Sequence, residues 1–528
     1  MPLPVGGTGK NDTRWPPDDK FDTYGKYQEH SAWYGGDVQE LAAVYTGMNG
    51  PNAKPKGLVN SVRGWFWGKE ALAPAPRPRI HVPMAADIAT VGADMLFSVS
   101  PTFKIQDEEA NEKIQDRLDE IVEEENFKRS ILECAEVSGA LGGVFLRMTW
   151  DEVLAPKRPL LTAVHPDSAV ADFRWGRLVG VTFWHVIKEG DGVCYRHLER
   201  HERGMIYHGL FKGTVDRFGG YYRGSAGMLG TRVPLTDLPE TASLVDGLDG
   251  PDFIATGITR MTAVYVPNML PNRLHRGSDL GRSDYQGSEG LMDALDEVYT
   301  SWMRDIQLGK GRIIVPAEFL RSVTGAKGQG AWFDAQQEIF VPLPGMNPAT
   351  DASLTISQFA IRTKEHQDTA MALIERIVAA AGYSASSFGM LGDVQAQTAT
   401  EIESRERRSF ITRSKKAQYW GPGLRDILMA ALEFDQKHFS GPGAAKIVVK
   451  FGTPVQEDML KRASSIEALA RAGAASIARL VKMSDDSLTD DQVTAEVALI
   501  QKEKGMMIPN STAPMPKVGI DPGNTSAK

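Results

Sequence analysis

The segment that comes nearest in composition to a nucleotide site is Gly6-Gly7-Thr8-Gly9-Lys10. A phosphate-binding loop requires a preceding strand, glycines at a fixed spacing, and Ser or Thr directly after the lysine. This segment has no predicted strand before it, lacks the spacing, and is followed by Asn11. We therefore interpret it as a flexible N-terminal stretch.

The histidines at positions 197, 201 and 208 cluster beside Glu199 and Glu202. Such residues can bind zinc, but the positions follow no recognised ligand spacing, and alternating polar side chains are normal on a half-exposed strand. The aspartates at 485, 486, 490 and 491 lack the central glycine and terminal glutamate of a calcium loop. We expect no metal and no cofactor.

Catalytic motifs are also missing from the sequence: it contains no GxSxG elbow and no HExxH pair. Cys134 and Cys194 lie far apart and outside any CxxC spacing, so we expect both to be reduced and structural. The chemistry-bearing residues thus predict a structural protein, with no catalytic residues.

Composition places the chain among multidomain globular proteins. It has 528 residues, of which 42% are hydrophobic and 24% charged, and a net charge of −8. That length favours several packed regions over one core. No apolar run reaches the roughly 18 to 20 residues of a membrane span, and the first residues do not resemble a signal peptide. We expect no membrane association and a location in the cytoplasm. The acidic balance argues against tight DNA binding, although it allows DNA to slide past.

The first half of the chain predicts an arm followed by a mixed domain. Residues 1–80 hold many aromatic residues, which either pack on a neighbouring subunit or close over their own domain. Short β runs after residue 144 predict an α+β domain. The glycine-rich residues 213–250 are typical of an extended loop inserted into that domain.

Two amphipathic helices are predicted around a small insert. The first spans 287–308 with Leu291, Leu295 and Val298 on one stripe, and its free side is acidic. Two β runs, 312–315 and 338–341, follow, joined through a loop at 324–330. The second helix is predicted at 357–381.

A flexible loop, 382–397, leads into Thr398-Ala399-Thr400-Glu401-Ile402, which has the spacing of a capping box and predicts a long helix. The triplet Gly421-Pro422-Gly423 is expected to kink or break this helix, which resumes up to residue 434. A β run at 446–451 then returns toward the sheet, and a helical tail extends to about residue 504.

This order of elements resembles the phage portal family, in the type found in long-tailed phages. The resemblance covers residues 33–504 and rests on the mixed domain, the helix-insert-helix unit, the loop leading into TATEI, and the helical tail. It implies a mostly helical α+β portal fold. The implied regions are an N-terminal arm (1–80), wing (81–284, with the insertion 213–250), stem helices (285–310 and 357–381), clip (311–356), tunnel loop (382–397), a long kinked wing helix with a returning strand (398–452), crown (453–505) and a disordered tail (506–528).

The resemblance also implies a function and partners. Family members form a ring, typically of twelve subunits, at one capsid vertex, through which double-stranded DNA is packaged and ejected without sequence readout. The implied partners are other copies of the chain, genomic DNA, the terminase large subunit, the major capsid and scaffolding proteins, and a head-tail adaptor. The protein is then expected in the virion, and in the host cytoplasm during assembly.

Three sets of residues are candidates for contact with DNA. Acidic stem residues would repel phosphates in the lumen: Asp293, Asp296, Glu297 and Asp305. The tunnel loop suits sliding contact, since Asp393 is the one charge between residues 384 and 395: its candidates are Ser384, Ser386, Ser387, Phe388, Met390, Leu391, Asp393 and Gln395. Basic residues of the following helix either touch DNA, bridge subunits or are simply solvated: Arg405, Arg407, Arg408, Lys415 and Lys416.

Two rival functions remain open on sequence. Another virion protein, such as a capsid or tail component, is usually β-rich and lacks two long helices around a small insert. A nuclease or protease of head assembly would hydrolyse substrate with an added divalent metal, which the portal hypothesis does not predict.

Overall fold

The chain folds as a mixture of helices and antiparallel sheets, as the sequence predicts, in a computed structural model. The structure describes residues 3–8, 12–38, 40–42, 44, 80–106, 111–123, 125–215, 227–308, 312–314, 321–325, 328–332, 355–357, 361–390, 399–452, 459–484 and 490–503. It divides into two units, Met1–Pro454 and Val455–Lys528.

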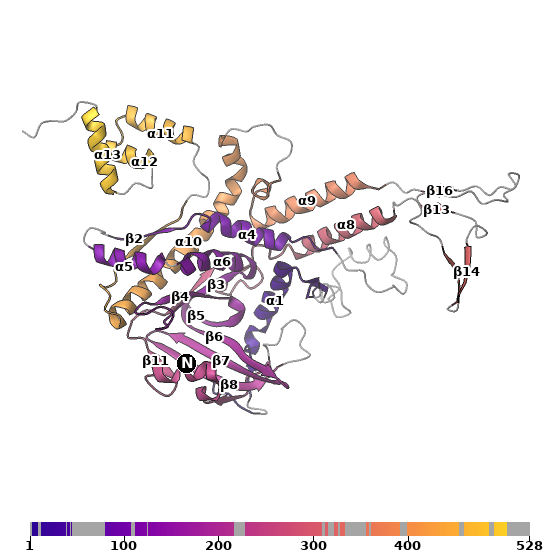
Figure 1. Cartoon of the computed structure of the whole chain (residues 1–528), viewed down its shortest axis with the longest axis horizontal. Coiled ribbons are helices and arrows are strands. Elements are labelled where there is room, and N and C mark those ends of the chain that lie inside the picture. The colour runs from indigo at the N-terminus through magenta and orange to yellow at the C-terminus, as the bar shows by residue number, and fades with distance from the viewer. Residues whose placement is uncertain are drawn as a thin grey trace, which may run out of the picture. The chain divides into compact units, whose positions relative to one another are not determined.

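In the first unit, α4, α5, α6 and α10 gather on one side of the sheets, and α8 and α9 extend away from them as a pair (Figure 1). The bounds of the helices in this unit are α1 Phe21–Gly35, α4 Met84–Phe97, α5 Glu112–Val122, α6 Glu125–Leu141, α7 Pro239–Ala242, α8 Glu289–Leu308, α9 Thr363–Ala381 and α10 Ala399–His438, with short 3-10 helices η2 Asp18–Lys20, η4 Pro166–Ser168, η5 Leu235–Asp237, η6 Val245–Gly247 and η8 Ala385–Phe388.

The largest sheet has the order β10-β8-β7-β6-β5, with β11 also paired to β8, and a smaller sheet has the order β12-β3-β4. The remaining pairs are β1-β9, β2-β17, β13-β16 and β14-β15. The strands are β1 Arg14–Trp15, β2 Thr102–Ile105, β3 Gly143–Thr149, β4 Leu160–Val164, β5 Ala169–Arg174, β6 Arg177–Gly190, β7 Val193–Glu202, β8 Met205–Thr214, β9 Gly227–Met228, β10 Thr231–Val233, β11 Phe253–Ala255, β12 Ala263–Pro267, β13 Arg312–Ile314, β14 Arg321–Gly325, β15 Gly328–Trp332, β16 Thr355–Ser357 and β17 Ile447–Lys450.

Two hydrophobic cores hold the first unit together. One joins α1, α4, α8, α9 and the large sheet, and the other joins α5, α6, α10 and the β12-β3-β4 sheet. Four aromatic side chains from the described part of the N-terminal arm belong to the first core: Trp15, Tyr24, Tyr27 and Trp33 are all buried, whereas Trp65, Phe66 and Trp67 lie outside the described residues. The sequence left open whether the aromatic rings of the arm pack on a neighbouring subunit or on their own domain. The structure shows that the four buried rings pack on their own domain.

Several predicted boundaries are wrong. Residue 357 belongs to β16, so the second long helix begins at Thr363. The predicted loop at 324–330 lies within the β14-β15 hairpin. The partner of β13 is β16, whereas the predicted run at 338–341 lies outside the described residues. The segment 213–250 is not simply a loop, because its described part contains β9, β10 and α7.

The helix α10 continues through Pro422, so of the two predicted outcomes, a kink or a break, the break is wrong. Its two glycines have different surroundings. A Cβ atom on Gly423 would lie 2.5 Å from Cγ2 of Val266 on β12, whereas one on Gly421 would meet only Phe451 at 3.7 Å. Gly423 thus permits the close approach of α10 to the small sheet. The predicted β run after α10 is confirmed by β17. Its expected return to the earlier sheet is wrong, because β17 pairs with β2 in a separate two-stranded sheet.

The second unit contains α11 (Met459–Arg471), α12 (Ile477–Ser484) and α13 (Asp490–Glu503), which pack in sequence order. The predicted helical tail is therefore three helices. Among the described residues, no helix is both long and apolar enough to cross a lipid bilayer.

Candidate functional site

The helices α8 and α9 lie side by side and share an apolar seam (Figure 1). Leu295 of α8 and Ile377 and Val378 of α9 are fully buried in this seam. Toward the far end of the pair, the Trp302 and His366 rings stack with centroids 6.1 Å apart. The apolar residues whose spacing predicted α8 are the residues that form this contact. The helix begins two residues later than predicted and ends at the predicted residue.

The acidic residues of α8 are less free than the sequence predicts. Asp296 is fully buried: its Oδ1 accepts the backbone N–H of Val82 at 2.8 Å, and its Oδ2 lies 3.0 Å from Nδ1 of His81. A buried carboxylate bonded to its own subunit cannot face a channel, so the expectation for Asp296 is wrong. The segment before α4 supplies these partners, and no local pattern in α8 reveals that contact.

Asp305 links the two helices. Its Oδ2 accepts hydrogen bonds from Arg362 at 2.9 Å and His366 at 3.0 Å. The hydrogen bond from His366, joined by the Arg362 guanidinium, lowers the pKa of Asp305 below its usual range. Because this carboxylate is neutralised within the helix pair, it adds little negative potential. Asp293 and Glu297 are half-buried, and the prediction that they line a channel stays a prediction.

The loop after α9 begins as an anchored turn. Gly382 adopts a left-handed conformation (φ 94°) and ends α9, and Thr412 of α10 donates a hydrogen bond to its carbonyl at 2.5 Å. A Cβ atom at this position would lie 2.8 Å from Oγ1 of Thr412. The glycine thus serves both the turn and the close approach of α10.

The next residues form η8, which is also fixed to α10. The backbone N–H of Ser384 donates to Oγ of Ser409 at 2.9 Å, and the hydroxyls of Ser387 and Ser409 are 2.8 Å apart. Phe388 and Met390 pack against the first core. Ser386 is half-buried in η8, and the candidates Leu391, Asp393 and Gln395 lie outside the described residues.

A buried ion pair lies where this turn meets the rest of the unit. Nζ of Lys416 on α10 is 2.5 Å from Oδ2 of Asp284, whose Oδ1 accepts from Asn268 at 2.8 Å. The hydroxyl of Tyr383 donates to the same Oδ2 at 3.3 Å, and burial raises its pKa far above the ordinary value. Lys416 is 1% exposed, so the expectation that it touches DNA or another subunit is wrong.

Small residues on two helices make room for this cluster. A Cβ atom on Gly92 would lie 2.6 Å from Oη of Tyr383 and 3.0 Å from Nζ of Lys416, and one on Gly139 would lie 3.2 Å from Oδ2 of Asp284. Sequence reasoning missed the cluster, although a glycine inside a helix, such as Gly92 in α4 or Gly139 in α6, is a signal of close approach.

Residues 17–510 match the sequence model of the family described as "Phage portal protein, SPP1 Gp6-like". The chain belongs to this phage portal family. The match spans both units, and it confirms the resemblance inferred from the order of elements.

Solved structures give more distant comparisons with this portal-family chain. One titled "Neck of empty GTA particle computed with C6 symmetry" has 13% identity and a TM-score of 0.41, and covers 81% of this chain and 99% of its own. Another, titled "Neck of native GTA particle computed with C12 symmetry", has 13% identity and a TM-score of 0.38, and covers 84% and 98%. No curated protein matches the chain.

The remaining basic candidates of the portal-family chain lie on the exposed side of α10. Arg407, Arg408 and Lys415 are exposed, and Arg408 donates to the carbonyl of Ala379 at 2.6 Å. The side chain of Arg405 is outside the described part. Their assignment to DNA or to a neighbouring subunit stays a prediction.

The histidine cluster is a packed network within the large sheet of the portal-family chain. The His197 and His208 rings stack at 5.3 Å, and His201 is bonded to Glu199 at 2.7 Å. Burial lowers the pKa of His197 to about 3. Within the described ranges, no group of three or more His, Cys, Asp or Glu residues could hold a metal ion. Both cysteines are buried free thiols.

Proposed function

We propose that copies of this portal protein close into a ring, and that the bore of the ring carries double-stranded DNA during packaging and ejection. The observation that carries this proposal is the α8-α9 pair, which projects from the sheets and is followed directly by the turn onto α10, in a chain whose residues 17–510 belong to a portal family. A paired-helix projection followed by a turn is suited to lining an axial channel.

The regions follow from this arrangement. The sheets and the helices α4, α5, α6 and α10 form the wing, α8 and α9 the stem, and the strands β13 to β16 the clip. The turn after α9 is the start of the tunnel loop, and α11 to α13 form the crown. Each assignment is a proposal based on the order of elements along the chain.

The channel wall is proposed to be acidic and weakly adhesive. Each subunit carries a net charge of −8, and a ring multiplies this charge by its subunit number. Asp293 and Glu297, which are both half-buried, are the proposed acidic residues of the wall. Asp296 is excluded because it is fully buried, and Asp305 is ion-paired with Arg362. DNA then passes without the accumulated lysine and arginine contacts that would hold it.

The proposed partners are those of a portal vertex. The clip contacts the terminase large subunit during packaging and a head-tail adaptor afterwards. The outer wing contacts the major capsid and scaffolding proteins. We propose twelve subunits and a location at one vertex of the virion, with the host cytoplasm as the site of assembly.

Negative-stain electron microscopy of the purified chain tests the proposal. We expect a field of rings with a central hole, and light scattering should give a mass that is a fixed multiple of the 57.7 kDa chain. A chain that stays monomeric at high concentration and does not occupy a unique vertex of the particle would overturn the proposal.

An enzymatic role is the alternative to be tested beside it. The portal family is structural, and we expect neither nuclease nor protease activity from the purified ring after magnesium, manganese or zinc is added. Hydrolysis that follows the ring through gel filtration would contradict this expectation.

A further inference from the structure

A turn with two exposed apolar side chains connects β3 and β4. Val153 is 90% exposed and Leu154 is 73% exposed. The turn, defined here as residues 151–158 and called the apolar turn, is nevertheless well fixed: Oδ1 of Asp151 accepts the backbone N–H groups of Val153 at 2.8 Å and Leu154 at 3.0 Å. Ala155 beneath them is buried.

The far side of the apolar turn is tied to two helices. Nη2 of Arg117 on α5 donates to the carbonyl of Lys157 at 2.7 Å and is also 2.6 Å from Asp435 of α10. The exposed pair is therefore presented on a rigid support. Apolar side chains held rigidly in solvent are typical of a contact surface, because they lose little entropy on binding.

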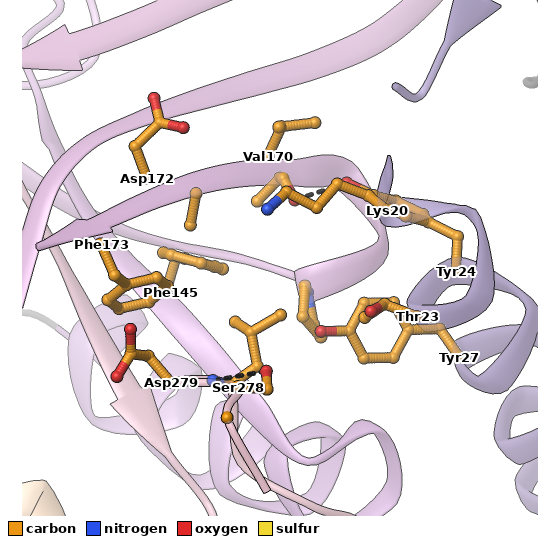
Figure 2. A pocket seen from close by; sticks show the side chains of 15 residues that line it. Lys20, Thr23, Tyr24, Tyr27, Phe145, Val170, Asp172, Phe173, Ser278 and Asp279 are labelled. Atoms are coloured by element: carbon orange, nitrogen blue, oxygen red, sulfur yellow. Dashed lines mark hydrogen bonds between the residues drawn. The ribbon is translucent and has the colours of Figure 1, made fainter. Parts of the chain in front are cut away.

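A pocket with aromatic side chains in its wall lies at the other end of the same hairpin (Figure 2). It has a volume of about 270 Å³ and lies between α1, β5 and the loop at 277–280. Its wall includes the rings of Tyr24, Tyr27, Phe145 and Phe173. We call it the aromatic pocket. Tyr24 fixes this wall by donating to the carbonyl of Ala169 at 2.6 Å.

The charges around the two features are complementary. Figure 2 shows Lys20 at one end of the aromatic pocket and the carboxylates of Asp172 and Asp279 at the other. In the apolar turn, the acidic Asp151 and Glu152 precede the apolar pair and the basic Lys157 follows it. Asp172 is already paired with Arg200 at 2.8 Å. When Leu154 enters the pocket, the acidic residues of the turn can face Lys20 while Lys157 faces Asp279.

An exposed tryptophan adjoins the same pocket. Trp175 is 94% exposed and has a left-handed conformation (φ 51°), which is unfavourable for a bulky residue. The next residue, Gly176, lies beside the pocket, because its Cβ position would be 3.8 Å from Oδ1 of Asp279. The exposed Trp175 is thus next in sequence to a residue at the pocket edge.

One chain cannot fill its own pocket. Phe145 lines the pocket and pairs with Val164, whereas Thr149 pairs with Leu160 next to the turn. Four residues of strand already separate these pairs by about 13 Å. Features at opposite ends of one element meet only between copies, in the head-to-tail contact that generates rings.

We propose that the apolar turn of one copy docks in the aromatic pocket of the next copy, with Leu154 inside the pocket and Trp175 against its edge. This inference rests on the proposed ring and names the surfaces that would close it. The partner is therefore a second copy of this chain.

Disulfide trapping tests the contact. The double variant Leu154→Cys with Thr23→Cys, oxidised as the full-length chain, is expected to give a ladder of cross-linked oligomers on a non-reducing gel. The native Cys134 and Cys194 are buried, so they do not compete. Matched controls are each single variant and Val245→Cys with Thr23→Cys, because Val245 is also exposed.

The possible outcomes separate this inference from the proposed function. Rings that form but cross-link no more than the controls would overturn the docking contact while leaving the ring proposal intact, and would mean that another molecule occupies the pocket. A parent chain that forms no rings would overturn both.

Substitutions that leave the fold intact give a second test. Leu154→Asp places a charge in the aromatic pocket and is expected to weaken self-association at least about 30-fold, while Leu154→Met retains it. Since Leu154 is exposed within one chain, circular dichroism of the two variants should be the same. Equal association of both variants would contradict the proposed contact.

The charge match predicts a rescue. Lys157→Glu and Asp279→Lys should each slow association, and combining them should restore it, because the reversed charges attract again. A double variant that associates no better than the weaker single variant would place these two charges apart in the ring.

Discussion

Single polar residues in this chain owe their roles to partners that are distant in sequence. Asp296 and Lys416 have the residue types expected of a channel wall and of a DNA contact, yet both are buried against their own subunit. Their partners, Val82 for Asp296 and Asp284 for Lys416, are separated from them by 214 and 132 residues. Periodicity reports only which face of a helix a residue occupies, so it cannot distinguish a lumenal acid from one bonded to another segment.

The ion pair between Lys416 and Asp284 predicts a large difference between adjacent lysines. Lys416→Met should destabilise the first unit by about 3 to 5 kcal/mol, because it leaves the Asp284 carboxylate buried without its counter-ion. Lys415→Met, at an exposed position, should change stability by less than about 0.5 kcal/mol. Denaturant unfolding followed by tryptophan fluorescence, to which buried residues such as Trp33 and Trp420 contribute, measures both variants.

The matched partner substitution sharpens this test. Adding Asp284→Asn to Lys416→Met removes the uncompensated charge and should recover part of the lost stability. Similar unfolding midpoints for the two single lysine variants would mean that the ion pair does not stabilise the fold.

The histidine network predicts loss of stability in acid. His197 has a folded pKa of about 3, against 6.5 when unfolded, so between these values the unfolded chain binds more protons. The contribution of His197 to the free energy of unfolding is therefore fully present above pH 6.5. It falls as the pH drops toward 3, by up to about 1.4 kcal/mol per pH unit. His208 and His185, whose pKa values burial also lowers, act in the same direction.

Glu199 adds to this acid sensitivity. Burial raises its pKa, but the hydrogen bond from His201 and the charge of Arg147 outweigh burial and hold the pKa below its usual range. Its contribution to stability is therefore also lost as the pH falls. His197→Gln should flatten the unfolding free energy between pH 6.5 and 4, while the exposed His275→Gln should not. Equal slopes for both variants and the parent would contradict this account.

At the scale of elements, the sequence predicts helices with a clear apolar stripe well, and their ends less well. The stripe of Leu291, Leu295 and Val298 places α8 to within two residues. The start of α9 is misplaced because Ser357 pairs with Arg312 in a sheet that only the folded chain brings together. Pro422 is the opposite case. A local rule predicts a break there, but the residues that follow it, from Leu424 to Phe434, pack into the second core and the helix continues.

The two glycines beside Pro422 predict opposite effects of the same substitution. Gly423→Ala should destabilise the first unit by about 1 to 3 kcal/mol, because the new methyl group would meet Val266 at 2.5 Å in a packed core. Gly421→Ala meets only an ordinary contact and should be neutral or stabilising by up to about 1 kcal/mol, from its better helix propensity.

Thermal unfolding of the two alanine variants beside the parent checks this pair. We expect the melting temperature of Gly421→Ala to equal or exceed that of the parent, and the melting temperature of Gly423→Ala to be lower. The reverse order would mean that α10 and β12 are not in close contact at Gly423.

At the scale of the whole molecule, charge decides how a ring of this chain would treat DNA. In the proposed ring, a net charge of −8 per subunit and the neutralised Asp305 between α8 and α9 would give a wall that neither attracts nor strongly traps phosphates. The exposed Arg407 and Lys415 on α10 supply positive charge that opposes this negative potential. Sequence composition gives this balance directly, but only the fold shows that Lys416 does not contribute to it.

The assembled ring should therefore bind duplex DNA weakly and without sequence preference. Two duplexes of equal length and unrelated sequence are expected to give equal fluorescence anisotropy titrations, because phosphate contacts carry no sequence information. If Arg407 and Lys415 reach DNA, replacing both by alanine should lower the slope of log affinity against log salt by about 0.9 for each lost contact, in rings of unchanged mass. If they bridge subunits instead, the same variant should lose ring mass first. A preference for one duplex that survives in the variant would show base readout elsewhere in the bore, and would contradict a channel built for sliding.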